Sequence, residues 1–296
     1  MSTYVLGISG VLIQLTVIVY NVPLLYTVTY MAITTIQEQI AKARKIVFKF
    51  GSGTLAGDNG KINASFLKEF ASQAASLIAG GKQVVIVSSG AQVAGLSTMD
   101  KWARKRDLHY RQALCAVGQV QLMNAWQIAF EPHGCHIAQI LLTQDDFNDQ
   151  IRTLNMRNTL FTLVDEGIIP IINENDTVSV EEIKIGDNDT LAAQSAILWS
   201  ADLLVLFSDI DGLYDKNPKE FPNAQLVELV QDIVTARKNV NIGSVSDFGT
   251  GGIDTKLDAA QRACSYGIAT IIANGGRPRC LEALANGSQK GTLFLA

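Results

Sequence analysis

The most regular feature of the sequence is a series of short apolar runs, each followed by a polar or glycine-rich turn and then by a helical pattern. Apolar runs of strand length without alternation are typical of parallel strands that are buried on both faces. Such runs predict strands over 45–50, 84–87, 136–142, 168–172, 203–207, 270–272 and 291–294. Repeated strand–helix units imply a mostly parallel sheet with helices on both faces.

The segments between these runs repeat apolar residues every three to four positions. After the first such segment, Gly80 and Gly81 supply a stop signal. The same signals predict helices over 65–79, 111–130, 153–166, 189–200 and 252–266. We therefore expect an α/β fold, a three-layer αβα sandwich with a mostly parallel central sheet, formed as one domain by residues 31–296.

The first 30 residues do not share this pattern. Residues 4–30 carry no charged side chain, and the first charged residue is Glu38. The stretch has the length of a membrane span but lacks the basic start and cleavage site of a signal peptide. We interpret residues 1–30 as an apolar N-terminal extension that is non-native or comes from a mis-called start codon, with Met31 as the natural start. A membrane anchor is the alternative.

Composition narrows the function classes. A formal net charge of −4 gives no electrostatic reason to expect a nucleic-acid partner. The four cysteines form no C-x-x-C pair and no zinc-ligand spacing, which indicates reduced thiols and a cytoplasmic protein. With only three histidines and no His-rich motif, we expect no metal held by the protein itself and chemistry that does largely without imidazole.

Two runs of Asn and Asp follow the apolar run 168–172. The first is Asn173-Glu174-Asn175-Asp176, and the second is Gly186-Asp187-Asn188-Asp189. Polar groups just past a buried parallel strand lie at the carboxyl edge of the sheet, where open α/β sheets bind ligands. Carboxylates suit an ammonium and amides suit a carboxylate, so the two runs together predict an amino-acid substrate. Asx-rich turns without a ligand are the alternative.

Two glycine-containing turns end the first two predicted strands. Lys49 precedes Gly51-Ser52-Gly53, where a predicted turn over 51–54 lets backbone N–H groups and an ammonium meet an anion. Ser88-Ser89-Gly90 ends the next strand in the same way. An edge-strand lysine before a hairpin turn, and a βα turn with a serine cap, are the alternatives.

Two later segments have features of a nucleotide site. The run Gly249-Thr250-Gly251-Gly252 leads into a helical pattern, and helix N-termini bind phosphate. Lys256 lies about one helical turn further on, so its ammonium can reach back to that phosphate. Ser208-Asp209 begins a turn that lines a nucleotide pocket or is a surface turn. A disordered loop is the alternative for the glycine run.

These parts together favour phosphoryl transfer. Lys49 and Lys256 are placed to neutralise the oxygens of a transferring phosphoryl group, a reaction that depends on positioning and charge. A carboxylate acceptor is already ionised at neutral pH, so no general base is needed.

The same motifs resemble those of the amino acid kinase family, in the right order from Lys45 to the C-terminus. Within that family they are most similar to the branch that phosphorylates L-glutamate. The motifs are K-F-G-S at 49–52, V-S-S-G-A at 87–91, I-N-E-N-D at 172–176, I-G-D-N-D at 185–189, S-D-I-D-G-L-Y at 208–214 and G-T-G-G at 249–252 with Lys256.

The resemblance implies ATP-dependent phosphorylation of the γ-carboxylate of L-glutamate, the first step of proline biosynthesis. It implies that Lys49 and Lys256 stabilise the phosphoryl group and that Asp189 holds them. Glutamate would be bound by Ser89, Asn173, Asp176, Asp187 and Asn188. ATP would be bound by Lys49, Gly51, Ser208, Asp209, Thr250, Gly251, Gly252, Ile253, Asp254, Thr255 and Lys256. Mg²⁺ would arrive on the nucleotide.

The resemblance also implies partners. They are proline as feedback inhibitor, glutamyl phosphate reductase as acceptor of the labile product, and further copies of the chain in a homo-oligomer. The chain stops at Ala296 without the C-terminal PUA domain that many relatives carry. Another carboxylate or carbamate kinase of the family, and a non-catalytic amino-acid sensor on the same fold, are the alternatives.

Overall fold

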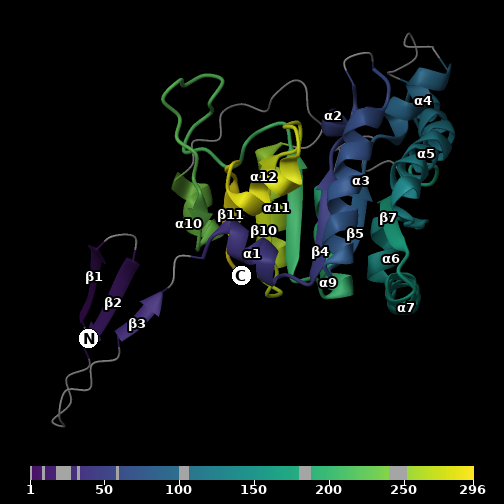
Figure 1. Cartoon of the computed structure of the whole chain (residues 1–296). Helices are drawn as coiled ribbons and strands as arrows, with labels where there is room; N and C mark the ends of the chain where they lie inside the picture. Colours follow the sequence, from purple (N-terminus) through teal and green to yellow (C-terminus); the bar gives the residue numbers. More distant parts are fainter. Residues whose placement is uncertain are drawn as a thin grey trace.

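We analysed a computed structural model of the chain. It describes residues 34–57, 60–99, 107–179, 188–239 and 252–296, together with the backbone of 2–8, 11–17 and 28–31. Figure 1 shows the arrangement of these elements.

The centre of the molecule is an eight-stranded sheet. Its strands run in the order β6-β7-β5-β4-β8-β10-β11-β9, and all neighbours pair in parallel except β10 with β11. The strands are β4 (Lys45–Phe50), β5 (Gln83–Ser88), β6 (Ile137–Leu142), β7 (Ile169–Glu174), β8 (Leu203–Ser208), β9 (Leu229–Val230), β10 (Ala269–Asn274) and β11 (Thr292–Phe294). The predicted mostly parallel sheet is confirmed.

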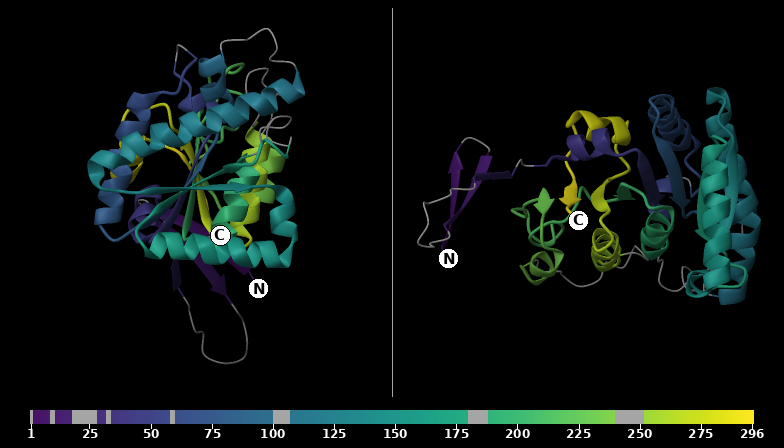
Figure 2. Two further views of the ribbon diagram at one scale, coloured as in Figure 1. Left: turned by 90° about the vertical axis from the view of Figure 1, so that its right-hand side faces the viewer. Right: turned by 90° about the horizontal axis from the view of Figure 1, so that it is seen from below.

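Helices cover both faces of this sheet, as Figure 2 shows. They are α1 (Ile36–Lys42), α2 (Ser52–Leu55), α3 (Ala64–Ala79), α4 (Ala91–Met99), α5 (Leu108–Phe130), α6 (Gln144–Asn148), α7 (Gln150–Asp165), α9 (Asn188–Trp199), α10 (Ile233–Asn239), α11 (Ile253–Cys264) and α12 (Cys280–Asn286), with a short 3₁₀ helix η2 (Glu131–His133). The expected three-layer sandwich is therefore present.

Successive side chains of β4 pack into two different cores, one on each face of the sheet. Ile46, Phe48 and Phe50 pack in one core with apolar residues of α1, α3, α5 and α12. Val47 packs in the other core, with residues of α7, α9 and α11. Successive side chains of a strand point to opposite faces, so Lys49 lies on the same face as Val47. Its ammonium is thereby directed to the layer that contains α9 and α11.

Two glycines set the distance between α4 and α5. A Cβ atom at Gly118 would lie 1.7 Å from the carbonyl oxygen of Ala91, and one at Gly95 would lie 2.0 Å from that of Leu114. No larger residue fits at either position without moving a helix backbone. The close approach holds α5 beside the loop between β5 and α4, where Ser89 lies.

The structure differs from the sequence predictions at several local points. Most of the predicted turn over 51–54 lies in the single helical turn α2 (Ser52–Leu55). Strand β7 continues through Asn173 and Glu174, which were expected to follow it. The helix predicted over 153–166 starts at Gln150, where the Asp149 side chain accepts from the Arg152 N–H and caps it. Local capping bonds account for this earlier start.

Three further strands lie in the apolar N-terminal stretch. They are β1 (Ser2–Ile8), β2 (Val11–Val17) and β3 (Val28–Met31), and they pair antiparallel with one another in a separate sheet. None of the helices in the described part of the chain is both long and apolar enough to cross a membrane.

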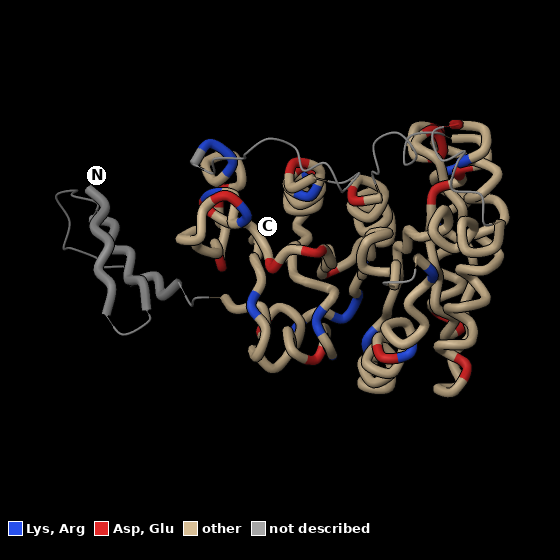
Figure 3. Tube along the Cα trace, turned by 90° about the horizontal axis from the view of Figure 1, so that it is seen from above, with Lys and Arg blue, Asp and Glu red and all other residues tan. Residues whose placement is uncertain are grey.

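Charged residues are distributed over the described elements without a basic face. Figure 3 shows Lys and Arg mixed with Asp and Glu along the helices and at their ends. This mixture agrees with the small net charge of −4.

Candidate active site

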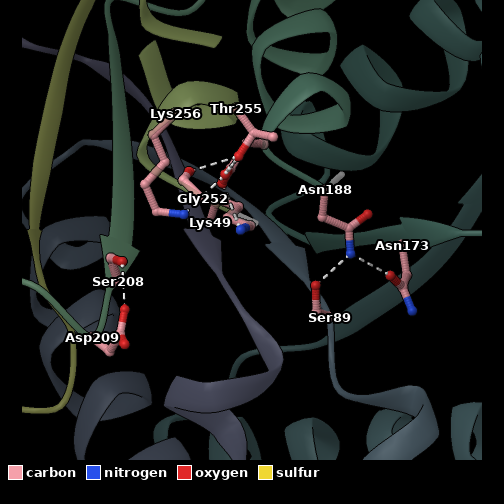
Figure 4. Close-up of polar contacts among 10 residues, drawn as sticks. Lys49, Ser89, Asn173, Asn188, Ser208, Asp209, Gly252, Thr255 and Lys256 are labelled. Carbon is pink, nitrogen blue, oxygen red and sulfur yellow. Dashed lines mark hydrogen bonds and ion pairs between the residues drawn. The ribbon is translucent and has the colours of Figure 1, made fainter. Parts of the chain in front are cut away.

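One buried carboxylate joins three elements at the centre of the site. Asp189 Oδ1 lies 2.6 Å from Lys49 Nζ, and Asp189 Oδ2 lies 3.0 Å from Lys256 Nζ. Their exposed fractions are 0% for Asp189, 3% for Lys49 and 5% for Lys256. We call this group the charged triad. The structure thus brings together three residues that are far apart in the sequence, from α9, β4 and α11 (Figure 4).

The protonation states within the charged triad follow from these distances. Burial alone would raise the pKa of Asp189, but the charges of Lys49 and Lys256 and their hydrogen bonds hold it well below its usual range. Burial lowers the pKa of Lys256, which the charge of Asp189 opposes and that of Lys49 reinforces. Asp189 is therefore a carboxylate at neutral pH, and it compensates the two cations that it contacts.

The first turn of α11 adds backbone donors beside the charged triad. Gly252 is the N-cap residue, and as a glycine it has no side chain with which to cap the helix. The Thr255 hydroxyl lies 2.9 Å from both Asp189 Oδ2 and the Gly252 carbonyl oxygen. Ile253 and Asp254 complete this first turn. Uncapped N–H groups at a helix N-terminus attract anions, so this end of the site suits phosphate.

A chain of neutral hydrogen bonds lies next to the charged triad. Asn188 Nδ2 donates to Ser89 Oγ at 2.6 Å and to Asn173 Oδ1 at 2.9 Å, and Asn173 Nδ2 donates to Gln119 Oε1 at 2.9 Å. We call these four residues the amide chain. All are buried. Figure 4 shows its members Ser89, Asn188 and Asn173 together, to one side of Lys49.

Asp176 lies just past β7 as a second buried acid. Burial, and then the charge of Glu174, raises the pKa of Asp176 to about 7, while a hydrogen bond with Cys115 and the charge of Arg111 oppose the rise. The Gln112 side chain donates to the Asp176 carbonyl oxygen at 3.1 Å. A carboxylate with a raised pKa gains from any cation that binds beside it.

The other end of the site lies at the end of β8. Ser208 Oγ donates to Asp209 Oδ1 at 3.1 Å, and β8 pairs with β4 so that Phe207 lies opposite Phe50. Gly51 follows β4 as the N-cap of α2, and a Cβ atom added there would lie 3.7 Å from Lys49 Nζ. Figure 4 shows Ser208 and Asp209 on the opposite side of Lys49 from Ser89. Three expected site residues, Asp187, Thr250 and Gly251, lie outside the described residues.

Sequence reasoning missed the contribution of α5. Gln112, Cys115 and Gln119 reach Asn173 and Asp176 from this helix. The available signal was a polar residue on an apolar helix face. Gln119 lies three positions before the core residue Leu122, so the two share a face of α5, and Gln119 is buried there.

Comparisons with known proteins identify relatives of the chain. The family model described as amino acid kinase family matches residues 44–274. A protein of Alkaliphilus metalliredigens named glutamate 5-kinase is 60% identical over 261 residues, which are 88% of this chain and 99% of that one. One of Geobacter sulfurreducens with the same name is 48% identical over 257 residues, 86% of this chain and 69% of that one.

A solved structure shows the same fold at low identity. It is a carbamate kinase from Giardia lamblia bound to AMP-PNP, 14% identical with a TM-score of 0.60, and the match covers 86% of this chain and 99% of that one. The family model spans most of the described sheet and includes all members of the charged triad. The chain therefore belongs to the amino acid kinase family.

Proposed function

We propose that the chain is a glutamate 5-kinase, which transfers the γ-phosphoryl group of ATP to the γ-carboxylate of L-glutamate in proline biosynthesis. The observation that carries the proposal is the charged triad beside the amide chain and Asp176. The charged triad suits a phosphoryl group, and the amide chain together with Asp176 suits an amino acid. The relatives at 60% and 48% identity carry the same activity in their names.

In this proposal the charged triad acts on the transition state. The ammonium groups of Lys49 and Lys256 contact the oxygens of the transferring phosphoryl group, where negative charge is spread. Asp189 does not react; it contacts both ammonium groups, at 2.6 and 3.0 Å, and so holds the two like charges in place beside each other. The acceptor carboxylate is ionised, so no base is required.

The amide chain and Asp176 bind glutamate. The Asp176 carboxylate pairs with the substrate ammonium, which compensates the cost of its burial. Ser89 Oγ accepts from Asn188, so its own hydroxyl hydrogen is available to donate to a substrate carboxylate. Asn173 orients the Asn188 amide from the other side. Asp187 belongs to this group by family resemblance alone.

ATP is bound by residues at the start of α11 and by residues at the ends of β4 and β8. The backbone of Gly252, Ile253, Asp254 and Thr255 receives phosphate at the start of α11, with Thr250 and Gly251 before it. Gly51 has no side chain, so its backbone can approach the ATP phosphates closely. Ser208 and Asp209 contact the nucleoside part of ATP.

The residues present fit a Mg²⁺ ion that is held mainly by the nucleotide phosphates. Both Asp189 oxygens contact lysines, and within the described ranges no three His, Cys, Asp or Glu side chains gather as a metal site. Mg²⁺ commonly uses substrate phosphates as ligands in kinases. When bound, the ion neutralises phosphate charge and orients the group to be transferred.

Further parts of the proposal rest on the family resemblance alone. They are proline as a feedback inhibitor at the glutamate site, a glutamyl phosphate reductase that accepts the labile product, and assembly into a homo-oligomer. A cytoplasmic location is proposed from the cysteine pattern. The extent of the catalytic domain, residues 31–296, also belongs here, with residues 1–30 as an extension that is not needed for activity.

A substrate panel tests the proposal. The full chain is incubated with ATP, Mg²⁺ and one of L-glutamate, L-aspartate, N-acetyl-L-glutamate or carbamate, and ADP release is measured. We expect release that depends on L-glutamate and exceeds that of every other substrate. Activity with carbamate or N-acetyl-L-glutamate instead would assign a different kinase of the family. No substrate-dependent ADP release would favour the non-catalytic sensor.

A further inference from the structure

One member of the amide chain has a polar atom that the contacts described so far leave unexplained. Gln119 is 8% exposed, and its Oε1 accepts from Asn173 Nδ2 at 2.9 Å. Its Nε2 is buried and has no hydrogen-bond partner among the described residues. A buried donor without a partner costs roughly 1–3 kcal/mol. Native proteins keep few such groups, and each calls for an explanation, of which a functional role in ligand binding is one.

The position of Gln119 indicates which part of a ligand it meets. The amide chain leads from Asn188, the neighbour of Asp189, through Asn173 to Gln119. Asn173 lies on the far side of Asn188 from Lys49 (Figure 4). Cys115 lies one turn before Gln119 on the same face of α5, and it hydrogen-bonds with Asp176. Gln119 and Asp176 therefore lie at the same end of the site, opposite the lysines.

A glutamate whose γ-carboxylate faces the phosphoryl group held by the lysines must place its ammonium and its α-carboxylate at this far end. Asp176 suits the ammonium, and a carboxylate requires N–H or O–H donors. We propose that Gln119 determines specificity for an α-amino acid: its Nε2–H donates to the α-carboxylate of glutamate while its Oε1 fixes Asn173. The inference rests on the proposed function and adds a residue that the site motifs do not contain.

The test combines two variants with a truncated ligand. Gln119→Met removes both hydrogen bonds, and Gln119→Glu keeps an acceptor for Asn173 but replaces the donor with a negative charge. The truncated ligand is 4-aminobutanoate, which has the ammonium and the reacting carboxylate of glutamate but no α-carboxylate. For glutamate kcat/KM is measured, and for 4-aminobutanoate the inhibition constant against glutamate turnover. Gln121→Met, an exposed position on the same helix, is the control.

We expect both variants to lower kcat/KM for glutamate by about 10- to 100-fold, the value of one hydrogen bond to a charged group, and Gln121→Met to leave it unchanged. The inhibition constant of 4-aminobutanoate should change by less than about twofold in Gln119→Met, because the lost contact has no counterpart in that ligand. The KM for ATP and the melting temperature should stay close to those of the wild type.

Two outcomes would overturn the inference. An equal loss for both ligands would show that Gln119 acts only through the packing of the pocket. A loss in Gln119→Met with full activity in Gln119→Glu would show that it serves only to hold Asn173. A wild-type chain without glutamate-dependent ADP release would instead overturn the proposed function, and this inference with it.

Discussion

The charged triad and the amide chain are adjacent, yet they are built on different physical principles. Lys49, Asp189 and Lys256 are fully charged groups in a buried setting, each held by an ion pair. Ser89, Asn188, Asn173 and Gln119 are neutral and hold one another by hydrogen bonds of defined direction. Asn188 and Asp189, consecutive residues at the start of α9, connect the two groups.

This difference indicates that the two groups have different roles within one site. Buried charges act strongly on charge that develops during a reaction, because little solvent screens them. Neutral amides contribute less energy each, but their fixed donors and acceptors distinguish one ligand from another. We therefore expect changes in the charged triad to affect kcat and changes in the amide chain or Asp176 to affect KM. The following predictions test this division.

The largest effect is expected from Asp189→Asn. The variant keeps the shape of the side chain but leaves the ammonium groups of Lys49 and Lys256 buried without a compensating charge. Breaking a buried ion pair in this way costs about 3–5 kcal/mol of unfolding free energy. Urea unfolding measures the loss, and Asp165→Asn, an exposed aspartate on α7, is the matched control. Equal stability of the two variants would show that the triad is not electrostatically coupled.

Removal of either lysine should have the next largest effect. Lys49→Ala and Lys256→Ala each lose one preorganised donor to the transition state, which typically lowers kcat by about 10²–10³. The KM for glutamate should change little, because the contacts assigned to ground-state glutamate are made by the amide chain and Asp176. Steady-state kinetics with both substrates varied measures the two constants, with Lys42→Ala at the exposed end of α1 as control. An increase confined to KM would place these lysines outside the reacting centre.

A smaller effect is expected from Asp176→Asn, which removes the proposed partner of the substrate ammonium. The KM for glutamate should rise by about 10- to 100-fold, the value of a hydrogen bond to a charged group, and ATP binding should stay intact. Steady-state kinetics measures the KM for glutamate, and isothermal titration with a non-hydrolysable ATP analogue measures ATP binding. A comparable loss for the two ligands would indicate a folding defect and not a lost contact.

The raised pKa of Asp176 gives a pH dependence with a defined sign. Since this pKa is about 7 in the folded protein, the carboxylate becomes protonated as the pH falls below that value. We expect kcat/KM for glutamate to fall on the acid side of about pH 7, and the fall to be absent in Asp176→Asn.

The unfolding free energy of the wild type should change with pH in the opposite direction to kcat/KM. A raised pKa in the folded state favours folding at low pH, and this contribution is lost as the pH rises through about 7. Asp176→Asn should therefore gain unfolding free energy relative to the wild type at pH 8 and not at pH 4. Unchanged relative stability across this range would contradict the raised pKa.

The smallest effect is expected from deletion of residues 1–30. Every described member of the charged triad and the amide chain lies at or beyond Lys49, and β1, β2 and β3 pair only with one another. Both kcat and KM should equal those of the full chain. A truncated protein that is inactive, beside an active full-length chain, would show that this segment supports the fold or the site.

The sequence predicted the charged triad more completely than the amide chain, for a physical reason. Lys49 within an apolar strand and Lys256 after a glycine run are conspicuous locally, and parallel strands place such residues at the same sheet edge. Gln119 has no local motif. It contacts Asn173, which is 54 positions away, and no short window of sequence contains such a contact.

Trapping of the product tests the central claim most directly. Wild type and Lys256→Ala are supplied with saturating ATP, Mg²⁺ and L-glutamate together with hydroxylamine, which converts a γ-glutamyl phosphate into a stable hydroxamate. We predict one γ-glutamyl hydroxamate for each ADP in the wild type, formed about 10²–10³ times more slowly in Lys256→Ala. ADP without hydroxamate, or an undiminished rate in Lys256→Ala at saturation, would contradict the account.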